Sequence, residues 1–363
     1  MTVYLLAGGG TGGHVNPLLA LAEAIRTSEP KSEVITLGTA EGLESRLVPL
    51  RGFELQIIEK LPFPRKLDGY AFAFPIKLRR AVNQIVKLIE ERKIEVVVGF
   101  GGYASAPAYL AAKRAKVPYV IHEANALPGL ANRLGARSAA AVGVAFASTK
   151  LPKAVTTGMP LRLEIEEAIL KANQLSARKE LGLNPDVATL LVTGGSLGAK
   201  RINETIAAAA GTLDAAGIQV LHITGGNSDL GEIQSPALVR MKYCDRMDLA
   251  IAAADLAVAR AGASTVCELG AFGLPSVFVP YPVGNGEQRF NAAGLVAAGG
   301  AILINDADFD SDSVRDLVIP LISNTKELKR MRLAARKASI SDGTIRLLQL
   351  VQSVLPANQR SDK

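Results

Sequence analysis

The chain has 363 residues, of which 34 are glycine and 48% are hydrophobic. This length and composition exclude a disordered or fibrous protein and predict about two globular α/β domains, each able to bury its own core. The net charge of +7 leaves three kinds of anionic partner open: nucleic acid, an anionic membrane surface or an anionic small molecule.

The first apolar run, residues 3–7, is predicted to be a buried strand. We expect it not to be a signal peptide, because the run is short and has no basic flank. We also expect no membrane span, because the sequence has no uninterrupted apolar stretch of about 18 residues. A cytoplasmic protein is therefore predicted.

A glycine loop, residues 8–13, follows this strand and leads through His14 into a helical pattern from Pro17. A strand, a glycine turn and a helix start bring backbone N–H groups close to a ligand above the sheet, which favours an anion such as phosphate. The loop also satisfies the G-x-G-x-x-G pattern, so by itself it fits both a nicotinamide-dependent enzyme and a nucleotide-sugar enzyme.

A basic and aromatic segment follows, in residues 60–80. From Leu78 onward its apolar residues recur at helical spacing, which predicts an ordinary packed helix. That packing does not explain Phe72 and Phe74, which we expect to be exposed. Exposed aromatic residues beside basic side chains are typical of a membrane-surface patch, so residues 61–80 are predicted to contact an anionic membrane. The basic residues are Lys60, Arg65, Lys66, Lys77, Arg79 and Arg80, against the single acid Asp68.

Short apolar runs then alternate with helical patterns, which predicts parallel sheets with helical crossovers. The pattern begins again at residues 189–193, which lead into a second glycine loop, residues 194–199, and another helix. Two Rossmann-like halves are predicted, joined near residues 161–183, with a last helix over residues 344–354. The strand-like runs are 34–37, 96–99, 119–121, 141–144, 189–193, 219–223, 256–259, 276–279 and 301–304.

Several polar signals have structural interpretations. The alternating aspartates of residues 306–312 lack the glycine and glutamate of a calcium-binding EF-hand loop, and Asp310 stands where it would cap a helix. His222 lies in an apolar run and is predicted to be a buried strand histidine. Cys244 and Cys267 show no metal-ligand spacing. We predict no metal and no cofactor.

A second candidate site follows the strand at residues 256–259. A helix is predicted to open at Ala263, with Glu268 one turn in. Free N–H groups at a helix start can hold a diphosphate, and a carboxylate one turn later can accept hydrogen bonds from both ribose hydroxyls. The pattern predicts a nucleoside diphosphate site. The alternative is that Glu268 is an ordinary surface acid.

Together, the motifs resemble the MurG family of glycosyltransferases, in the same order and over nearly the whole chain. The opening glycine loop alone is shared with other glycosyltransferases, whereas the set is specific. Ala124, Ala261 and Cys267 depart from common family residues, and none of them removes a charge. The motifs are residues 10–14 with Pro17, residues 101–105, residues 122–125, residues 194–199, residues 260–265 with Glu268, and Gln288 with Asn291.

The resemblance implies a GT-B fold of the α/β class, with two Rossmann-like domains whose parallel sheets face each other across a cleft. It implies an inverting enzyme that moves N-acetylglucosamine from UDP-N-acetylglucosamine to lipid I, an N-acetylmuramyl-(pentapeptide)-pyrophosphoryl-undecaprenol, giving lipid II of peptidoglycan. Residues 1–160 would face the membrane and hold the acceptor, residues 161–340 would bind the UDP-sugar, and residues 341–363 would return to the N-terminal domain.

The implied partners are UDP-N-acetylglucosamine, lipid I, the anionic inner leaflet at the cytoplasmic face of the cell membrane, and other cell-wall synthesis proteins, but no nucleic acid. Matching positions imply the donor contacts, with a backbone contact to uracil near Cys244. The glycine-rich loop after residue 100 is expected to cradle the acceptor pyrophosphate. The donor set is Thr11, Gly12, Gly13, Asn125, Arg162, Ser196, Cys244, Ala263, Ser264, Thr265, Val266, Cys267, Glu268 and Gln288. The acceptor set is Gly102, Tyr103, Ala104 and Ser105.

The chemistry requires two catalytic functions. Displacing UDP with inversion needs stabilisation of the departing diphosphate, and a base that deprotonates the acceptor hydroxyl from the opposite side. The diphosphate is assigned to the C-terminal half, so the base should come from the N-terminal half. His14 and Glu123 are the candidates, and the ordinary pKa of histidine, about 6.5, suits a base better. A capping or structural role is the alternative for His14.

Other classes of protein remain as alternatives. A nicotinamide oxidoreductase is disfavoured because residues 38–40 carry no acid at the end of the second strand. A non-catalytic nucleotide-sugar binding protein would have no use for His14. A UDP-sugar epimerase or a glycolipid synthase of similar architecture is the nearer rival, and the reaction products would distinguish them.

Overall fold

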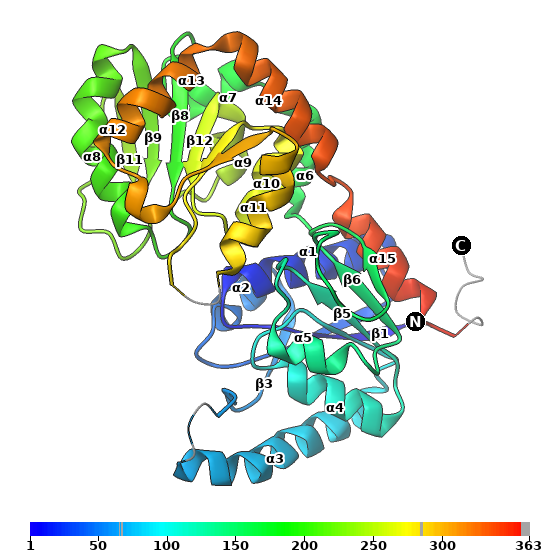
Figure 1. The fold of residues 1–363 in the computed structure, drawn as a ribbon. Coiled ribbons are helices and arrows are strands. Elements are labelled where there is room, and N and C mark those ends of the chain that lie inside the picture. The colour runs from blue at the N-terminus through cyan, green and yellow to red at the C-terminus, as the bar shows by residue number, and fades with distance from the viewer. Residues whose placement is uncertain (65, 67, 284–285, 357–363) are drawn as a thin grey trace. The chain divides into compact units, whose positions relative to one another are not determined.

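The computed structural model describes residues 1–64, 66, 68–283 and 286–356 (Figure 1). The chain divides into two compact units. Unit 1 contains Met1–Arg162 and the chain from Asp342 onward, and unit 2 contains Leu163–Ser341. Both units are α/β, each with its own sheet. Arg65 and Leu67 of the basic segment lie outside the described residues.

Unit 1 contains a fully parallel sheet. Its strands are β1 (Val3–Ala7), β2 (Glu33–Gly38), β3 (Glu54–Ile57), β4 (Val96–Gly99), β5 (Tyr119–Glu123), β6 (Ala141–Val144) and β7 (Ala154–Thr156). They lie in the order β3-β2-β1-β4-β5-β6-β7. Its helices are α1 (Gly12–Ser28), α2 (Glu44–Leu50), α3 (Gly69–Arg92), α4 (Ser105–Ala115), α5 (Leu130–Gly135) and α15 (Gly343–Ser353).

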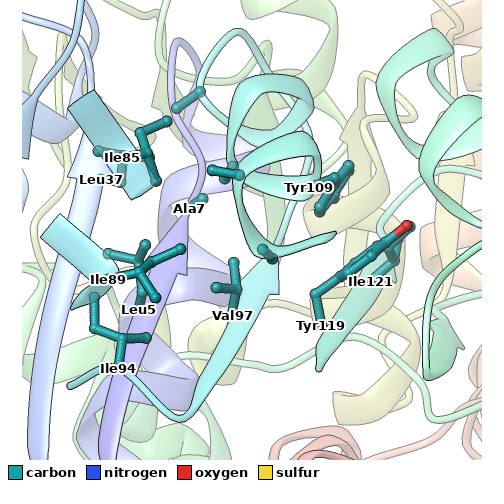
Figure 2. Close-up of a cluster of buried hydrophobic side chains, with 14 of the residues drawn as sticks. Leu5, Ala7, Leu37, Ile85, Ile89, Ile94, Val97, Tyr109, Tyr119 and Ile121 are labelled. Carbon is teal, nitrogen blue, oxygen red and sulfur yellow. The ribbon is translucent and has the colours of Figure 1, made fainter. Parts of the chain in front are cut away.

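The core of unit 1 lies on both faces of this sheet. Every residue of β1 is buried, as expected for a central parallel strand that reads as a continuous apolar run. Leu5 packs on one face with Ile85 and Ile89 of α3, as Figure 2 shows. Tyr4 and its neighbours on the opposite face pack with α1 and with Leu347 of α15. The last helix therefore completes the core of unit 1.

Unit 2 repeats this plan. Its strands are β8 (Ala188–Thr193), β9 (Ile218–Ile223), β10 (Ile233–Gln234), β11 (Leu238–Met241), β12 (Leu256–Ala259), β13 (Ser276–Phe278) and β14 (Ala301–Leu303), in the order β10-β11-β9-β8-β12-β13-β14. The edge strand β10 pairs antiparallel with β11, and the other pairs are parallel.

The helices of unit 2 complete its α/β plan. They are α6 (Leu163–Lys171), α7 (Gln174–Glu180), α8 (Lys200–Ala215), α9 (Met247–Ala253), α10 (Ala263–Phe272), α11 (Glu287–Ala297), α12 (Ser311–Ser313), α13 (Ile319–Ser323) and α14 (Thr325–Ala338). A 3₁₀ turn covers Asp306–Asp308, and a π-helical turn covers Val314–Val318.

The predicted strands are present in the structure, with ends that differ by at most two residues. Strands β3, β7, β10 and β11 were not predicted, because they are short and contain exposed or half-exposed residues that give a weak apolar pattern. Helix α1 begins at Gly12 rather than Pro17, because the glycines already adopt helical geometry. Asp310 caps α12 through a reciprocal pair of hydrogen bonds with Ser313, as predicted. No helix in the described part of the chain combines the length and apolarity needed to cross a bilayer.

Candidate active site

Many of the predicted site residues follow strands at the switch point of each sheet. Glu123 and Asn125 instead lie at the end of β5, Cys244 follows β11 and Gln288 follows β13. In an open α/β sheet, ligands bind beyond the carboxyl ends of neighbouring strands whose connections run in opposite directions. In unit 1 this point lies between β1 and β4, and in unit 2 between β8 and β12. The glycine loops of residues 8–13 and 101–105 leave the first pair, and those of residues 194–199 and 260–265 leave the second.

His14 lies in the first turn of α1. Its Nδ1 is 3.1 Å from the carbonyl oxygen of Gly9 and 3.4 Å from the Thr11 hydroxyl. Because a carbonyl only accepts, we assign the proton to Nδ1, which leaves Nε2 as an acceptor in the neutral ring. Burial lowers the pKa of His14 below 6.5, and the nearby Glu123 partly opposes that effect. The ring is therefore neutral near pH 7, as a base must be.

A glycine keeps the edge of this ring uncovered. Gly101, in the loop after β4, has φ +92°, and a Cβ there would lie 3.1 Å from Nε2 of His14. A larger residue would be strained and would crowd the nitrogen that we assign as acceptor. Gly102 has φ +78°, and a Cβ at this residue would lie only 2.3 Å from the carbonyl oxygen of Gly9. The two glycine loops of unit 1 therefore pack directly against each other.

Glu123 ends β5 and is buried. Its carboxylate accepts hydrogen bonds from the N–H groups of Asn125 and Gly129 and from Nδ2 of Asn132, each at 2.9 Å. These three bonds use most of the acceptor capacity of the carboxylate. The geometry therefore favours His14 over Glu123 as the proton acceptor and gives Glu123 a role in shaping the loop that carries Asn125.

The sequence analysis missed two members of this network, Asn132 on α5 and Tyr109 on α4. Both are buried, and the Tyr109 hydroxyl donates to Oδ1 of Asn132 at 2.7 Å. Small residues make room for the tyrosine ring, since a Cβ at Gly99 or Gly135 would lie 2.2 or 2.6 Å from it. Within a helical pattern a single asparagine gives no signal, so only the fold brings Asn132 to Glu123.

The acceptor loop of residues 102–105 divides into an internal and an exposed part. The Ser105 hydroxyl accepts from the Gly101 N–H at 2.9 Å and contacts the carbonyls of Ala7 and Gly101. Its hydrogen bonds are therefore made within the protein. Tyr103 is partly exposed, and the Lys60 ammonium lies 5.3 Å from its ring centre. Helix α4 begins at Ser105, so its first N–H groups have no partner within the helix.

The predicted diphosphate site of unit 2 opens helix α10. Gly262 precedes the helix without any side-chain cap. Among the described residues, the buried Ser264 hydroxyl finds no hydrogen-bond partner. Glu268 is only 8% exposed, which excludes the surface-acid alternative. Burial, together with the charge of Glu268, raises the pKa of the Cys267 thiol to about 12, so this cysteine is inert at neutral pH.

Arg260, which follows β12, connects this strand to the segments that follow β13 and β14. Its guanidinium donates to the carbonyls of Val279 and Pro280 at 3.0 and 3.1 Å and pairs with Asp306. The predicted donor residue Gln288 accepts from the Tyr281 N–H at 2.9 Å. The ends of β12, β13 and β14 are thereby fixed to one another.

The remaining predicted donor residues are distributed over both units. Unit 1 contains Thr11, Gly12, Gly13, Asn125 and Arg162. Unit 2 contains Ser196, Cys244, residues 263–268 and Gln288. Ser196 is exposed at the tip of the second glycine loop, and Cys244 is buried between β11 and α9. In the described residues, no three histidine, cysteine or acidic side chains gather as metal ligands.

The basic segment of unit 1 forms the first half of α3 and the chain before it. Phe72 and Ile76 are exposed, at 78% and 67%. Phe74 is not: it is half-buried, with its ring 5.5 Å from Phe63 and 6.0 Å from Tyr70. The expectation of two exposed phenylalanines is therefore corrected. Lys66, Arg79 and Arg80 are exposed, whereas Lys77 is half-buried and pairs with Glu59.

Comparison with known proteins identifies the family. Residues 4–144 match the glycosyltransferase family 28 N-terminal domain, and residues 189–347 match the C-terminal domain of that family. A relative from Leifsonia xyli subsp. xyli, named as a UDP-N-acetylglucosamine--N-acetylmuramyl-(pentapeptide) pyrophosphoryl-undecaprenol N-acetylglucosamine transferase, is 56% identical over 357 residues, covering 98% of this chain and 100% of the relative. The chain belongs to the MurG family of glycosyltransferases.

Another MurG relative, from Streptomyces coelicolor, is 45% identical, and the alignment covers 98% of this chain and 99% of the relative. Both relatives bear the name UDP-N-acetylglucosamine--N-acetylmuramyl-(pentapeptide) pyrophosphoryl-undecaprenol N-acetylglucosamine transferase. The crystal structure of MurG from Acinetobacter baumannii is 27% identical and superposes with a TM-score of 0.77, over 98% of this chain and 100% of that one. The fold class expected from the sequence, two Rossmann-like α/β domains of the GT-B type, is confirmed.

Proposed function

We propose that this chain transfers N-acetylglucosamine from UDP-N-acetylglucosamine to N-acetylmuramyl-(pentapeptide)-pyrophosphoryl-undecaprenol. The observation that carries the proposal is the His14 ring, held through Nδ1 by Gly9 so that Nε2 stays unprotonated beside a glycine. A protein that only binds nucleotide sugars would not need a neutral imidazole there. The names and the 45–56% identity of the relatives supply the substrates.

In the proposed reaction, unit 2 binds the donor. The N–H groups that open α10 and the Ser264 hydroxyl face the diphosphate, and the buried Glu268 carboxylate accepts from the ribose hydroxyls. As the bond between the anomeric carbon and the diphosphate oxygen breaks, its electron pair leaves with UDP. The helix N–H groups stabilise the charge that develops there.

Unit 1 supplies the acceptor side. The acceptor hydroxyl oxygen attacks the anomeric carbon from the face opposite UDP, and its proton passes to Nε2 of His14. Glu123 stabilises the imidazolium that results, because its negative charge raises the pKa of His14. The N–H groups of residues 102–105 are assigned to the acceptor pyrophosphate. Displacement from the opposite face inverts the anomeric configuration.

We assign the membrane contact to unit 1. Phe72 and Ile76 are exposed among basic residues at the start of α3. Such a surface suits the anionic inner leaflet, where the polyprenyl tail of the acceptor is held. The enzyme would then act peripherally at the cytoplasmic face of the membrane, near other cell-wall synthesis proteins.

Product analysis tests the proposed reaction. Purified protein is incubated with UDP-N-acetylglucosamine and a lipid I analogue, and the products are separated by chromatography and identified by mass. We expect free UDP in equal amount to a disaccharide-bearing lipid. An isomerised UDP-sugar without transfer would instead establish an epimerase, and the absence of both products would refute the proposal.

A further inference from the structure

A buried carboxylate outside the proposed reaction lies against the opening glycine loop. Glu44, the first residue of α2, is fully buried. Its Oε2 accepts from the Gly10 N–H at 2.7 Å, and its Oε1 accepts from both the N–H and the hydroxyl of Thr39, each at 2.8 Å. Over the described residues, no lysine, arginine or histidine forms an ion pair with it. A buried charge held only by hydrogen bonds is costly and calls for an explanation.

Three glycines make the space for this carboxylate: Gly9 in the loop after β1, Gly38 at the end of β2, and Gly42 in the turn between β2 and α2. A Cβ would lie 2.3 Å from a Glu44 side-chain atom if placed at Gly9, 2.4 Å at Gly38 and 2.0 Å at Gly42. The glycine loop therefore closes around an anion that belongs to the chain itself. The Gly10 N–H, which a phosphate would otherwise bind, is already used by Glu44.

The carboxylate is connected to His14 through one peptide unit. The Gly10 N–H and the Gly9 carbonyl belong to the same planar peptide group, so fixing the first fixes the second. That carbonyl is the oxygen beside Nδ1 of His14 and the one against which Gly102 packs. The charge of Glu44 also raises the pKa of His14 against the effect of burial.

We propose that Glu44 is a positioning residue for His14. By holding the peptide between Gly9 and Gly10, it keeps the Gly9 carbonyl where it accepts from Nδ1 and leaves Nε2 facing the reaction. The catalytic consequence rests on the proposed function, whereas the effect on the histidine ring does not.

The decisive variant is Glu44→Gln, which has nearly the same shape but brings an amide N–H₂ toward the Gly10 or Thr39 donors. Glu41→Gln is the matched control, since Glu41 is an exposed acid in the same loop. We expect Glu44→Gln to lower kcat about tenfold, in line with the steep cost of sub-ångström misplacement. The KM for UDP-N-acetylglucosamine should stay within about twofold, because the contacts to the diphosphate and the ribose are assigned to α10 of unit 2.

A second readout does not depend on activity. The chain has three histidines, so the ring nitrogens of His14 can be followed by ¹⁵N NMR in the presence of only two others. His122 and His222 are fully buried, and their signals report whether the variant is folded. In Glu44→Gln we expect the Nδ1–H signature of His14 to weaken and its titration to move to lower pH, with no change in Glu41→Gln.

The outcomes separate the two proposals. If His14 keeps its tautomer and titration in a folded Glu44→Gln protein, Glu44 is merely structural and the inference fails. If the ring changes but kcat does not, the positioning holds and the assignment of His14 as base fails. Should Glu44→Gln not fold, Thr39→Val removes a single hydroxyl donor to the same carboxylate. We then expect the same NMR change on a smaller scale, and an unchanged ring would overturn the inference.

Discussion

The two units carry a strand, a glycine loop and a helix at the same place in their sheets, yet the loops are closed in different ways. In unit 1 the loop after β1 wraps around the carboxylate of Glu44. In unit 2 the loop after β8 packs closely against the backbone of the loop after β9: a Cβ at Gly198 would lie 2.3 Å from the Thr224 carbonyl oxygen, and one at Gly225 would lie 2.1 Å from the Gly198 nitrogen. Within the loop, the Gly195 N–H donates to the Thr193 hydroxyl at 3.3 Å.

Under the proposed function, this difference assigns a different chemical role to each unit. The loop of unit 1 leads into His14, whose Nδ1 lies 3.1 Å from the Gly9 carbonyl oxygen, the contact from which we assign the tautomer. Unit 2 has no histidine at that place, and its polar groups follow the next strand, where Ser264 and Glu268 lie in α10. Topology determines where a ligand lies, whereas the residues after each strand decide whether a proton is moved or an anion is held.

The largest expected effect comes from removing the histidine. In His14→Ala we expect kcat to fall about 100-fold or more, as for loss of a general base, while UDP affinity stays within a few-fold. Steady-state kinetics and calorimetric titration with UDP measure the two quantities. In the wild-type enzyme, kcat/KM should fall only when the pH drops below about 6.5, because burial lowers the pKa of His14.

Glu123→Gln is the comparison for this variant. Its carboxylate already accepts three hydrogen bonds, so we expect a smaller loss of kcat than in His14→Ala. Near-normal turnover in His14→Ala together with a large loss in Glu123→Gln would transfer the role of base to Glu123.

The next effect concerns unit 2, to which the donor diphosphate and ribose are assigned. Glu268→Ala removes the proposed charged partner of the ribose, an interaction worth about 1.5 to 3 kcal/mol, so the Kd for UDP should rise about 10-fold to 100-fold. Glu204→Ala, which alters an exposed acid on α8 of the same unit, is the control. An unchanged Kd in Glu268→Ala would remove this residue from the donor site.

A smaller effect distinguishes the surfaces of the two units. Replacing Phe72 and Ile76 with serine should reduce co-sedimentation with anionic liposomes about tenfold, since full burial of one such side chain is worth about 1.5 to 3 kcal/mol and these insert only partly. Binding by the wild-type protein should persist in part at high salt, because the apolar term is not screened.

Leu333→Ser is the matched control for liposome binding, since Leu333 is 70% exposed on α14 of unit 2. Activity on a water-soluble, short-chain acceptor should be unchanged in the Phe72 and Ile76 variant. Equal loss of liposome binding in both variants, or loss of activity on the soluble acceptor, would show that the surface of α3 is not a dedicated membrane contact.

The last effect is on stability, and here the units should behave alike. Burial lowers the pKa of His122 in unit 1 and of His222 in unit 2 to about 4. Between about pH 6.5 and pH 4 the unfolded chain therefore binds more protons than the folded one, and the free energy of unfolding decreases as the pH falls through that window. Urea denaturation at pH 7 and pH 5 measures the change.

Acidic groups also titrate in the lower part of that window, so His222→Gln is the comparison. The variant should lose part of the difference between pH 7 and pH 5, whatever its stability at pH 7. If the free energy of unfolding of the variant changes between pH 7 and pH 5 as much as that of the wild type, then His222 does not contribute to this pH dependence.

The sequence predicted those features that depend on residues near one another in the chain. β1 and β8 were recognisable as continuous apolar runs bounded by glycine, and Glu268 stood one turn into a predicted helix. Phe74 was predicted wrongly because Phe63, which covers it, lies outside its helix. The place of Glu44 could not be predicted either: Gly38 and Gly42 are its neighbours in the chain, but only the pairing of β1 with β2 brings Gly9 and Gly10 to its carboxylate.

Helix α15 has a consequence for the order in which the protein folds during synthesis. Leu347 and Val351 complete a core that includes Tyr4 and Leu6 of the first strand, and Gln352 donates to Glu29 at 2.6 Å. All of unit 2 is translated between these partners. The chain of unit 2 is therefore synthesised while the face of unit 1 that α1 covers still lacks α15. Until residues 343–353 emerge, the apolar surface that α15 covers stays exposed to water, and a chain truncated before α15 is expected to be more sensitive to proteolysis.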